Sequence, residues 1–182
     1  TITMEVDMTN PAKLHEETTF SYTDIPAKAV AAALKEHPLL NSTLEDEQIR
    51  VFEDINVGVA VATDKGLLVP VIHSADRKSL AEISSITKEL VERARLGKLS
   101  RKELTGGTFT VTNLGMYGVD VFIPIINPPE AAILGAGKVT EKPVVVNREV
   151  KTKPAMQLSL SLDHRIVDGA PAAQFLKRVK PL

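Results

Sequence analysis

Two residues near the carboxyl end of the sequence have the types and the spacing for acid–base chemistry. His164 is followed four residues later by Asp168, which directly precedes Gly169. Histidine has an ordinary pKa near neutral pH, so His164 could act as a general base. Asp168, which precedes Gly169 and Pro171, could simply cap a following helix. Residue types alone leave open whether His164 is catalytic or structural.

The sequence on either side of His164 indicates which elements would position it. Leucine alternates with serine over residues 158–162, a period of two that predicts a strand with one buried face. Apolar residues fall on one side of a predicted helix over residues 170–179. His164 is therefore expected in a loop between a strand and a helix, and a rigid element that ends in a loop is a common mount for a catalytic group.

Composition excludes several classes of function. The chain has 182 residues, enough for one domain with a substantial core, and its net charge of −1 gives no basic excess for nucleic-acid binding. No apolar run is long enough to span a membrane. The absence of cysteine excludes disulfides, thiolate metal sites and a cysteine nucleophile. The chain opens inside a predicted strand, so we expect a fragment of a longer polypeptide.

Periodicity predicts an alternation of strands and helices, and thus an α/β fold. The stretch 67–72 is almost entirely apolar, so we expect it to be buried on both faces. Asp24 is expected to cap a helix over residues 26–37, and Arg93 belongs to the charged face of a helix over 79–96, which we expect to be solvated. The glycines of 135–137 precede a lysine but lack the other residues of a phosphate-binding loop. Strands are predicted over 1–8, 56–63, 67–73 and 108–114, around the prolines of 122–135, and in a hairpin over 144–150.

The sequence also resembles a known family. Residues 164–169 match the His-x-x-x-Asp-Gly pattern of CoA-dependent acyltransferases, which chloramphenicol acetyltransferases share. Together with the stretches 64–71, 107–115 and 122–135, they resemble the catalytic domain of dihydrolipoyl acyltransferases, the core enzymes of 2-oxo acid dehydrogenase complexes. The resemblance implies the chloramphenicol-acetyltransferase-like fold, a mixed sheet flanked by helices, with residues 1–182 as a single acyltransferase domain. The lipoyl and peripheral-subunit-binding domains of the family are absent from this stretch.

The resemblance implies transfer of an acyl group, acetyl or branched-chain, between dihydrolipoyl groups and coenzyme A. His164 would remove the proton of the attacking thiol, and Asp168 would hold the loop and the imidazole. Thr112 stands where many relatives have a serine, and its hydroxyl would stabilise the oxyanion of the tetrahedral intermediate. Coenzyme A enters as a substrate, and the lipoyl group is carried on a separate domain. No metal or redox cofactor is required, and the sequence assigns no residues to coenzyme A binding.

Partners also follow from the resemblance. His164 and Thr112 would come from neighbouring subunits around a trimer axis, and homotrimers would assemble into a cubic or an icosahedral core. The 2-oxo acid decarboxylase and dihydrolipoamide dehydrogenase components would bind through the absent domains. The location would be cytoplasmic, or alternatively the mitochondrial matrix, with neither a nucleic acid nor a membrane as a partner.

Two other functions remain open at this stage. An enzyme of the same fold could acylate a small free acceptor such as an antibiotic, but it would not be expected to share the stretches 64–66 and 128–130. A scaffold or binding module could have lost activity, although His164, Asp168 and a hydroxyl at position 112 are all present.

Overall fold

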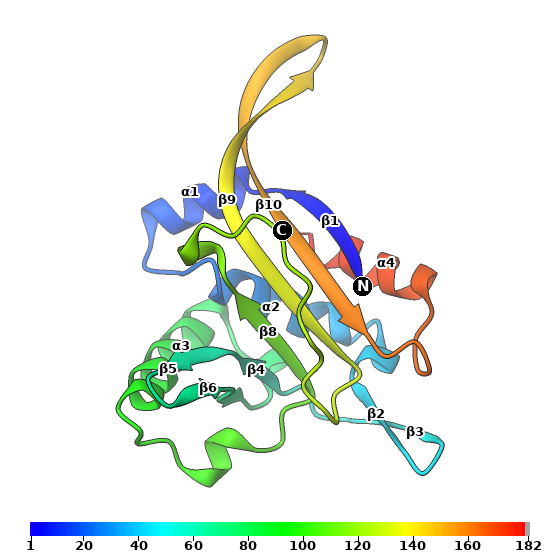
Figure 1. Ribbon diagram of the computed structural model, residues 1–182. Helices are drawn as coiled ribbons and strands as arrows, with labels where there is room; N and C mark the ends of the chain where they lie inside the picture. The colour runs from blue at the N-terminus through cyan, green and yellow to red at the C-terminus, as the bar shows by residue number, and fades with distance from the viewer. Residues whose placement is uncertain (181–182) are drawn as a thin grey trace.

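A six-stranded mixed sheet forms the centre of the computed structural model, which describes residues 1–180 (Figure 1). The strand order is β1-β10-β9-β8-β4-β7, in which β8 runs parallel to both β9 and β4 and the other pairs are antiparallel. The strands are β1 (Ile2–Asp7), β4 (Val57–Val59), β7 (Val71–Ile72), β8 (Phe109–Asn113), β9 (Ala132–Val146) and β10 (Glu149–Leu162). Two hairpins stand apart from this sheet: β2 (Ser42–Glu45) with β3 (Gln48–Val51), and β5 (Val61–Thr63) with β6 (Gly66–Leu68).

Helices cover one face of the sheet. They are α1 (Thr9–Glu17), α2 (Asp24–Leu34), α3 (Leu80–Arg95) and α4 (Gly169–Arg178), with short 3₁₀ helices at η1 (Pro38–Leu40), η2 (Ala75–Arg77), η3 (Arg101–Leu104) and η4 (Gly115–Tyr117). The core forms where the apolar faces of α2, α3 and α4 meet the inward side chains of the strands. Phe109 of β8, for example, packs against Phe175 of α4 with ring centroids 5.6 Å apart. The predicted α/β class and the mixed sheet flanked by helices are confirmed.

The alternation of leucine and serine in β10 produces two different faces. Leu158 and Leu160 are buried in the core. Ser159 and Ser161 point to the opposite face, where their hydroxyls contact those of Thr3 and Thr1 at 3.2 and 2.8 Å. The second face of β10 thus carries small, polar side chains. The irregular segment 118–131 passes in front of this face (Figure 1).

Two predicted strand regions are correct only in part, although the predicted turn from Thr63 to Gly66 does join β5 to β6. Residues 56–73 do not form two continuous strands, because β4 and β7 join the main sheet whereas β5 and β6 form a separate hairpin. Leu67 is 67% exposed, so the apolar stretch that it begins is not buried on both faces. Pro70 lacks an N–H and separates β6 from β7. No strand forms over residues 122–127, because Pro124, Pro128 and Pro129 remove the donors that a strand ladder needs.

The capping predictions have different outcomes. Ser79 and Glu82 form the expected capping box at the start of α3, and Gly97 ends it at φ +65°. Asp24 is not the cap of α2: it is the first helical residue, and its carboxylate accepts a hydrogen bond from the backbone N–H of Ser21 at 2.7 Å.

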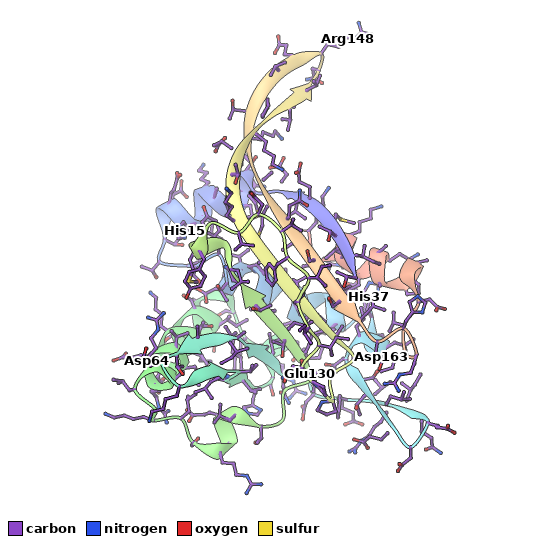
Figure 2. The ribbon with its side chains drawn as sticks, in the orientation of Figure 1. His15, His37, Asp64, Glu130, Arg148 and Asp163 are labelled. Atoms are coloured by element: carbon purple, nitrogen blue, oxygen red, sulfur yellow. The ribbon has the colours of Figure 1, made fainter. Side chains whose placement is uncertain are left out.

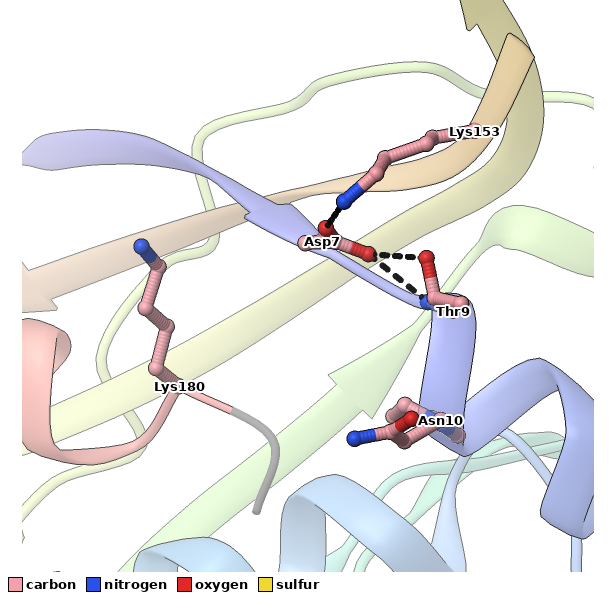
Figure 3. Close-up of a pocket in the computed structure, with 6 residues that line it drawn as sticks. Asp7, Thr9, Asn10, Lys153 and Lys180 are labelled. Atoms are coloured by element: carbon pink, nitrogen blue, oxygen red, sulfur yellow. Dashed lines mark hydrogen bonds and ion pairs between the residues drawn. The ribbon is translucent and has the colours of Figure 1, made fainter. Parts of the chain in front are cut away.

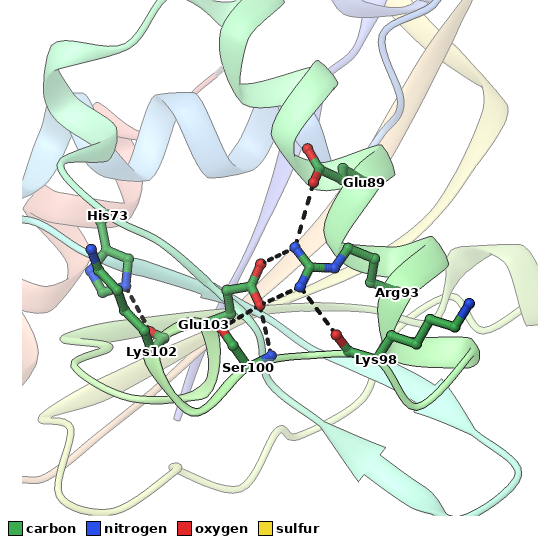
Figure 4. Close-up of polar contacts among 7 residues, drawn as sticks. All are labelled: His73, Glu89, Arg93, Lys98, Ser100, Lys102 and Glu103. Carbon is green, nitrogen blue, oxygen red and sulfur yellow. Dashed lines mark hydrogen bonds and ion pairs between the residues drawn. The ribbon is translucent and has the colours of Figure 1, made fainter.

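The charged face of α3 is exposed as predicted at Lys88, Glu89, Glu92 and Arg95, and the exception is the half-buried Arg93. Its guanidinium contacts both carboxylate oxygens of Glu103 in η3 and donates to the backbone carbonyl of Lys98 at 3.1 Å (Figure 4). Glu103 in turn accepts hydrogen bonds from Ser100, and these bonds lower the pKa of its carboxyl. The cluster ties α3 to the segment that leads into β8.

Candidate active site

The loop that carries His164 is anchored at both ends. Asp163 donates its backbone N–H to the carbonyl of Ala131 at 2.8 Å, at the point where β9 begins (Figure 2). Its carboxylate accepts hydrogen bonds from Arg165 at 2.6 to 3.2 Å, which lower the pKa of the Asp163 carboxyl. Ile166 and Val167 then enter the core. His164 projects outward from this turn, with its side chain 74% exposed.

Asp168 contacts His164 and does not cap the helix that follows. It occupies the N-cap position of α4, but its side chain makes no capping hydrogen bond. Its Oδ1 instead lies 3.4 Å from Nδ1 of His164. That contact leaves Nε2 as the ring nitrogen free to accept a proton. Of the two roles open to Asp168, the geometry favours orientation of the imidazole.

Thr112 lies on an inner strand and lines a cavity of about 590 Å³. The end of its strand is held in place, because Asn113 donates from its side-chain amide to Thr23 Oγ1 at 3.1 Å and accepts the N–H of Gly115 at 2.8 Å. The cavity is lined mostly by apolar groups from β4, β5, β6, α3 and the loop after β8, among them Val59, Leu67, Val91, Leu114, Met116 and Tyr117.

The glycines of 135–137 have a packing role. A Cβ atom on Gly137 would lie 1.9 Å from the backbone oxygen of Asp120, and one on Gly115 would lie 2.6 Å from the carbonyl oxygen of Gly137. The backbone of Val119 accepts a hydrogen bond from Lys138 at 2.8 Å. The chain after β8 therefore crosses β9 at backbone-to-backbone distance, and this crossing fixes the loop beside Thr112.

One chain does not bring His164 and Thr112 together. Thr112 is level with Gly135 on β9, whereas Leu162, the last residue of β10, is level with Ala132. Three residues along the strands and two strand spacings across them separate the Cα atoms of Thr112 and Leu162 by roughly 14 Å. His164 lies beyond Leu162, and it is not among the residues that line the cavity beside Thr112.

Glu130 is a buried acid that residue-type reasoning missed. Its side chain is 7% exposed, and burial raises the pKa of its carboxyl to about 7, although hydrogen bonds with Thr110 and Asn127 act in the opposite direction. The signal available in the sequence was its place between two prolines and the apolar run that begins β9. A carboxyl group in the position of Glu130, directly before a buried strand, reaches solvent only if the chain turns outward at that point.

The remaining candidate sites are structural. Among residues 1–180, no group of three histidine, aspartate or glutamate side chains is placed to hold a metal ion, and no helix is long and apolar enough to span a membrane. A second cavity, of about 340 Å³, lies beside Asp7 (Figure 3). The Asp7 carboxylate accepts hydrogen bonds from Lys153 at 2.7 Å and from the N–H of Thr9 at 2.9 Å, and these contacts lower its pKa to about 2. They join β1, β10 and α1.

Comparisons with known proteins agree with this architecture. Residues 1–182 match the family model described as 2-oxoacid dehydrogenases acyltransferase (catalytic domain). The chain is 42% identical over 190 residues to the dihydrolipoyllysine-residue acetyltransferase component of the acetoin cleaving system of Bacillus subtilis (strain 168), covering 99% of this chain and 48% of the relative. It is 48% identical over 153 residues to the dihydrolipoyllysine-residue succinyltransferase component of the 2-oxoglutarate dehydrogenase complex of Bartonella vinsonii subsp. berkhoffii, covering 84% and 37%. The chain thus spans about half of these relatives, or less.

Solved structures give the same result. The cubic core of a pyruvate dehydrogenase multienzyme complex superposes with a TM-score of 0.94 at 35% identity, over 98% of this chain and 78% of that one. A dihydrolipoamide acetyltransferase of Azotobacter vinelandii superposes with a TM-score of 0.93 at 35% identity and the same coverage. A chloramphenicol acetyltransferase superposes with a TM-score of 0.66 at 14% identity, over 98% and 85%, which shows a shared fold.

The Azotobacter enzyme was investigated for the roles of a serine, a histidine and an asparagine in its catalytic mechanism. Those residues have the same spacing along their chain as Thr112, His164 and Asp168 have here. The match over the full chain and the identity with these relatives together show that the chain belongs to the family of 2-oxoacid dehydrogenase acyltransferase catalytic domains.

Proposed function

We propose that this chain transfers an acyl group between dihydrolipoyl groups and coenzyme A as the core of a 2-oxo acid dehydrogenase complex. The observation that carries the proposal is the shared spacing of Thr112, His164 and Asp168 with the three residues investigated in the Azotobacter acetyltransferase. The alternative acylation of a small free acceptor is less well supported, because chloramphenicol acetyltransferase shares the fold at only 14% identity.

The proposed reaction needs one base and one hydrogen-bond donor. Nε2 of His164 removes the proton from the thiol of coenzyme A, and the sulfur attacks the carbonyl carbon of the acyl-lipoyl thioester. The carbonyl oxygen becomes an anion, and the Thr112 hydroxyl donates a hydrogen bond to it. The bond from carbon to the lipoyl sulfur then breaks, and the imidazolium returns its proton to that sulfur. Both substrates bring their own sulfur, so no acyl-enzyme forms.

We propose that two copies of the chain form each active site. His164 is 74% exposed in one chain, and roughly 14 Å separates the end of its strand from Thr112, so a second chain has to bring the two groups together. The likeness to a cubic core supports homotrimers that assemble further. In such a trimer, His164 of one subunit faces Thr112 of the next, and water is excluded from both.

Two positions depart from the residue types of the Azotobacter enzyme. Threonine replaces serine at 112, which keeps the hydroxyl but adds a methyl group that restricts its rotation. Aspartate replaces asparagine at 168, which adds a negative charge next to His164. Both replacements preserve the proposed role, donation to the oxyanion in one case and orientation of the imidazole in the other.

The acyl group and the partners are the finer part of the proposal. We propose acetyl or branched-chain acyl groups as donors, although the identity of 44% to an acetyltransferase and 48% to a succinyltransferase does not rank them. The lipoyl group would be carried on a separate domain, and the decarboxylase and dihydrolipoamide dehydrogenase components would bind outside residues 1–182. The bacterial relatives support a cytoplasmic location.

The proposal is tested by acyl transfer from acetyl-CoA, isobutyryl-CoA and succinyl-CoA to dihydrolipoamide. His164→Ala is expected to lower kcat by about 10²–10⁴-fold, because the general base is lost. His73→Ala is the matched control, since that ring is hydrogen-bonded to the Lys102 carbonyl at 3.1 Å and does not line the cavity beside Thr112. Equal activity of His164→Ala and wild type would contradict the mechanism. An assembled wild type that transfers none of the three groups would favour the scaffold alternative.

A further inference from the structure

Glu130 lies in a turn between the two parts of the proposed site, the strand that carries Thr112 and the loop that carries His164. Its backbone N–H donates to the carbonyl of Asn127 at 3.0 Å, which closes a turn directly before β9. The next residue, Ala131, accepts the N–H of Asp163 at 2.8 Å and donates its own N–H to the carbonyl of Ser42 at 3.1 Å. The turn therefore holds the base of the His164 loop, and Figure 2 shows Glu130 and Asp163 next to each other.

The side chain of Glu130 joins the same turn to β8. Asn127 donates from its side-chain amide to Glu130 Oε1 at 3.2 Å, and the same nitrogen lies 3.5 Å from the hydroxyl of Thr110. Thr110 and Thr112 are two residues apart on one strand, so their side chains share a face. A Cβ atom on Gly107 would lie 3.2 Å from Glu130 Oε1, so the glycine leaves room for the carboxyl.

The surroundings of Glu130 favour its uncharged acid form below neutral pH. Thr110, Asn127 and Gly107 carry no charge, and Glu130 Oε2 is buried with no hydrogen-bond partner among the described residues. Two titratable groups lie on neighbouring elements: Asp163, whose carboxylate accepts hydrogen bonds from Arg165, and His73, which follows β7. Neither is a cause of the raised pKa of Glu130. As pH rises through about 7, the folded chain acquires a buried charge with one oxygen unpaired.

We propose that Glu130 is a positioning residue, which holds the Asn127–Ala131 turn between the face of β8 that carries Thr112 and the loop that carries His164. The inference rests on the proposed function. Because His164 and Thr112 of one chain would serve two different active sites in a trimer, each Glu130 would position parts of two neighbouring sites. The carboxyl acts through the turn, since it is buried and hydrogen-bonded to Asn127.

The first test compares kcat and KM for acyl transfer between pH 6 and 9 in the assembled protein. Glu130→Ala is expected to lower kcat by about tenfold or more with KM for coenzyme A changed less than about threefold, as misplacement of reacting groups predicts. Glu130→Gln, a neutral isostere, is expected to keep kcat within about threefold of wild type at pH 6.5. It should also remove the decline in kcat above pH 7 that is expected of wild type. Glu141→Gln, an exposed carboxylate on β9, should retain that decline.

The second measurement needs no turnover. Hydrogen exchange of a peptide over residues 162–168 is expected to be at least about tenfold faster in Glu130→Ala, because the N–H of Asp163 depends on the Ala131 carbonyl. Glu130→Gln at pH 6.5 should exchange as wild type does. Unchanged exchange in Glu130→Ala, or an alkaline decline that persists in Glu130→Gln, would overturn the inference. A wild type with no transfer activity but with the expected exchange pattern would instead refute the proposed function alone.

Discussion

Thr112 and His164 are held in opposite ways. Thr112 lies on an inner strand, beside a backbone crossing so close that Gly137 has no room for a side chain. His164 projects from a turn at the end of β10 with its ring 74% exposed, and Asp168 is its contact at 3.4 Å. One half of the proposed site is thus complete within the chain, whereas the other half remains open to solvent. In the proposed mechanism, the fold of one chain would prepare the oxyanion side, and assembly would complete the base side.

Among variants of Thr112, Gly137 and Asp168, the largest effect is expected at Thr112, on the enclosed side. Thr112→Val removes the hydroxyl but keeps the shape of the side chain, and kcat for acyl transfer is expected to fall by about 10²–10³-fold. Thr112→Ser keeps the hydroxyl and should stay within about tenfold of wild type. The kcat of both variants is measured by steady-state kinetics. An equal loss of kcat in the two would show that the methyl group matters and the hydroxyl does not.

A pair of glycine variants compares the two sides directly. Gly137→Ala places a Cβ atom 1.9 Å from the Asp120 oxygen, so it should cost about 1–3 kcal/mol of unfolding free energy and lower Tm by roughly 5 °C. Gly169→Ala, beside the His164 loop, meets no atom within 4 Å and should leave Tm unchanged or slightly raised. The Tm of both variants is measured by calorimetry. A similar fall in Tm for the two would contradict the contrast between a packed Thr112 side and an open His164 side.

The smallest effect is expected at Asp168. Its carboxylate is 81% exposed in one chain, and an exposed ion pair contributes little. The Azotobacter enzyme has an asparagine at the same spacing. Asp168→Asn is therefore expected to lower kcat by less than about tenfold and to change unfolding free energy by no more than about 0.5 kcal/mol. A thousandfold fall in kcat would instead assign the negative charge a direct part in proton transfer.

The sequence predicted best where one local pattern decides the structure. The alternation that ends in Leu162 gives β10, and the Ser79–Glu82 spacing gives the start of α3. It failed where backbone donors decide, since the prolines of residues 122–129 exclude the strand that their apolar neighbours favoured. His164 was a candidate from its residue type and its place after a strand, whereas Asp168 and Thr112 were assigned roles through the family resemblance. Glu130 was missed, because its burial depends in part on Thr110 of β8, which is distant from it in the sequence.

The central claim, that two chains share each site, is tested most directly by mixing inactive subunits. His164→Ala and Thr112→Val chains are unfolded together in equal amounts and allowed to reassemble, with each variant reassembled alone as the control. In a cyclic trimer, every mixed assembly contains one site with both wild-type residues out of three, so random mixing should restore about a quarter of wild-type activity. Recovery to that level would support the shared site. Mixtures that form trimers but stay as inactive as the separate variants would contradict it.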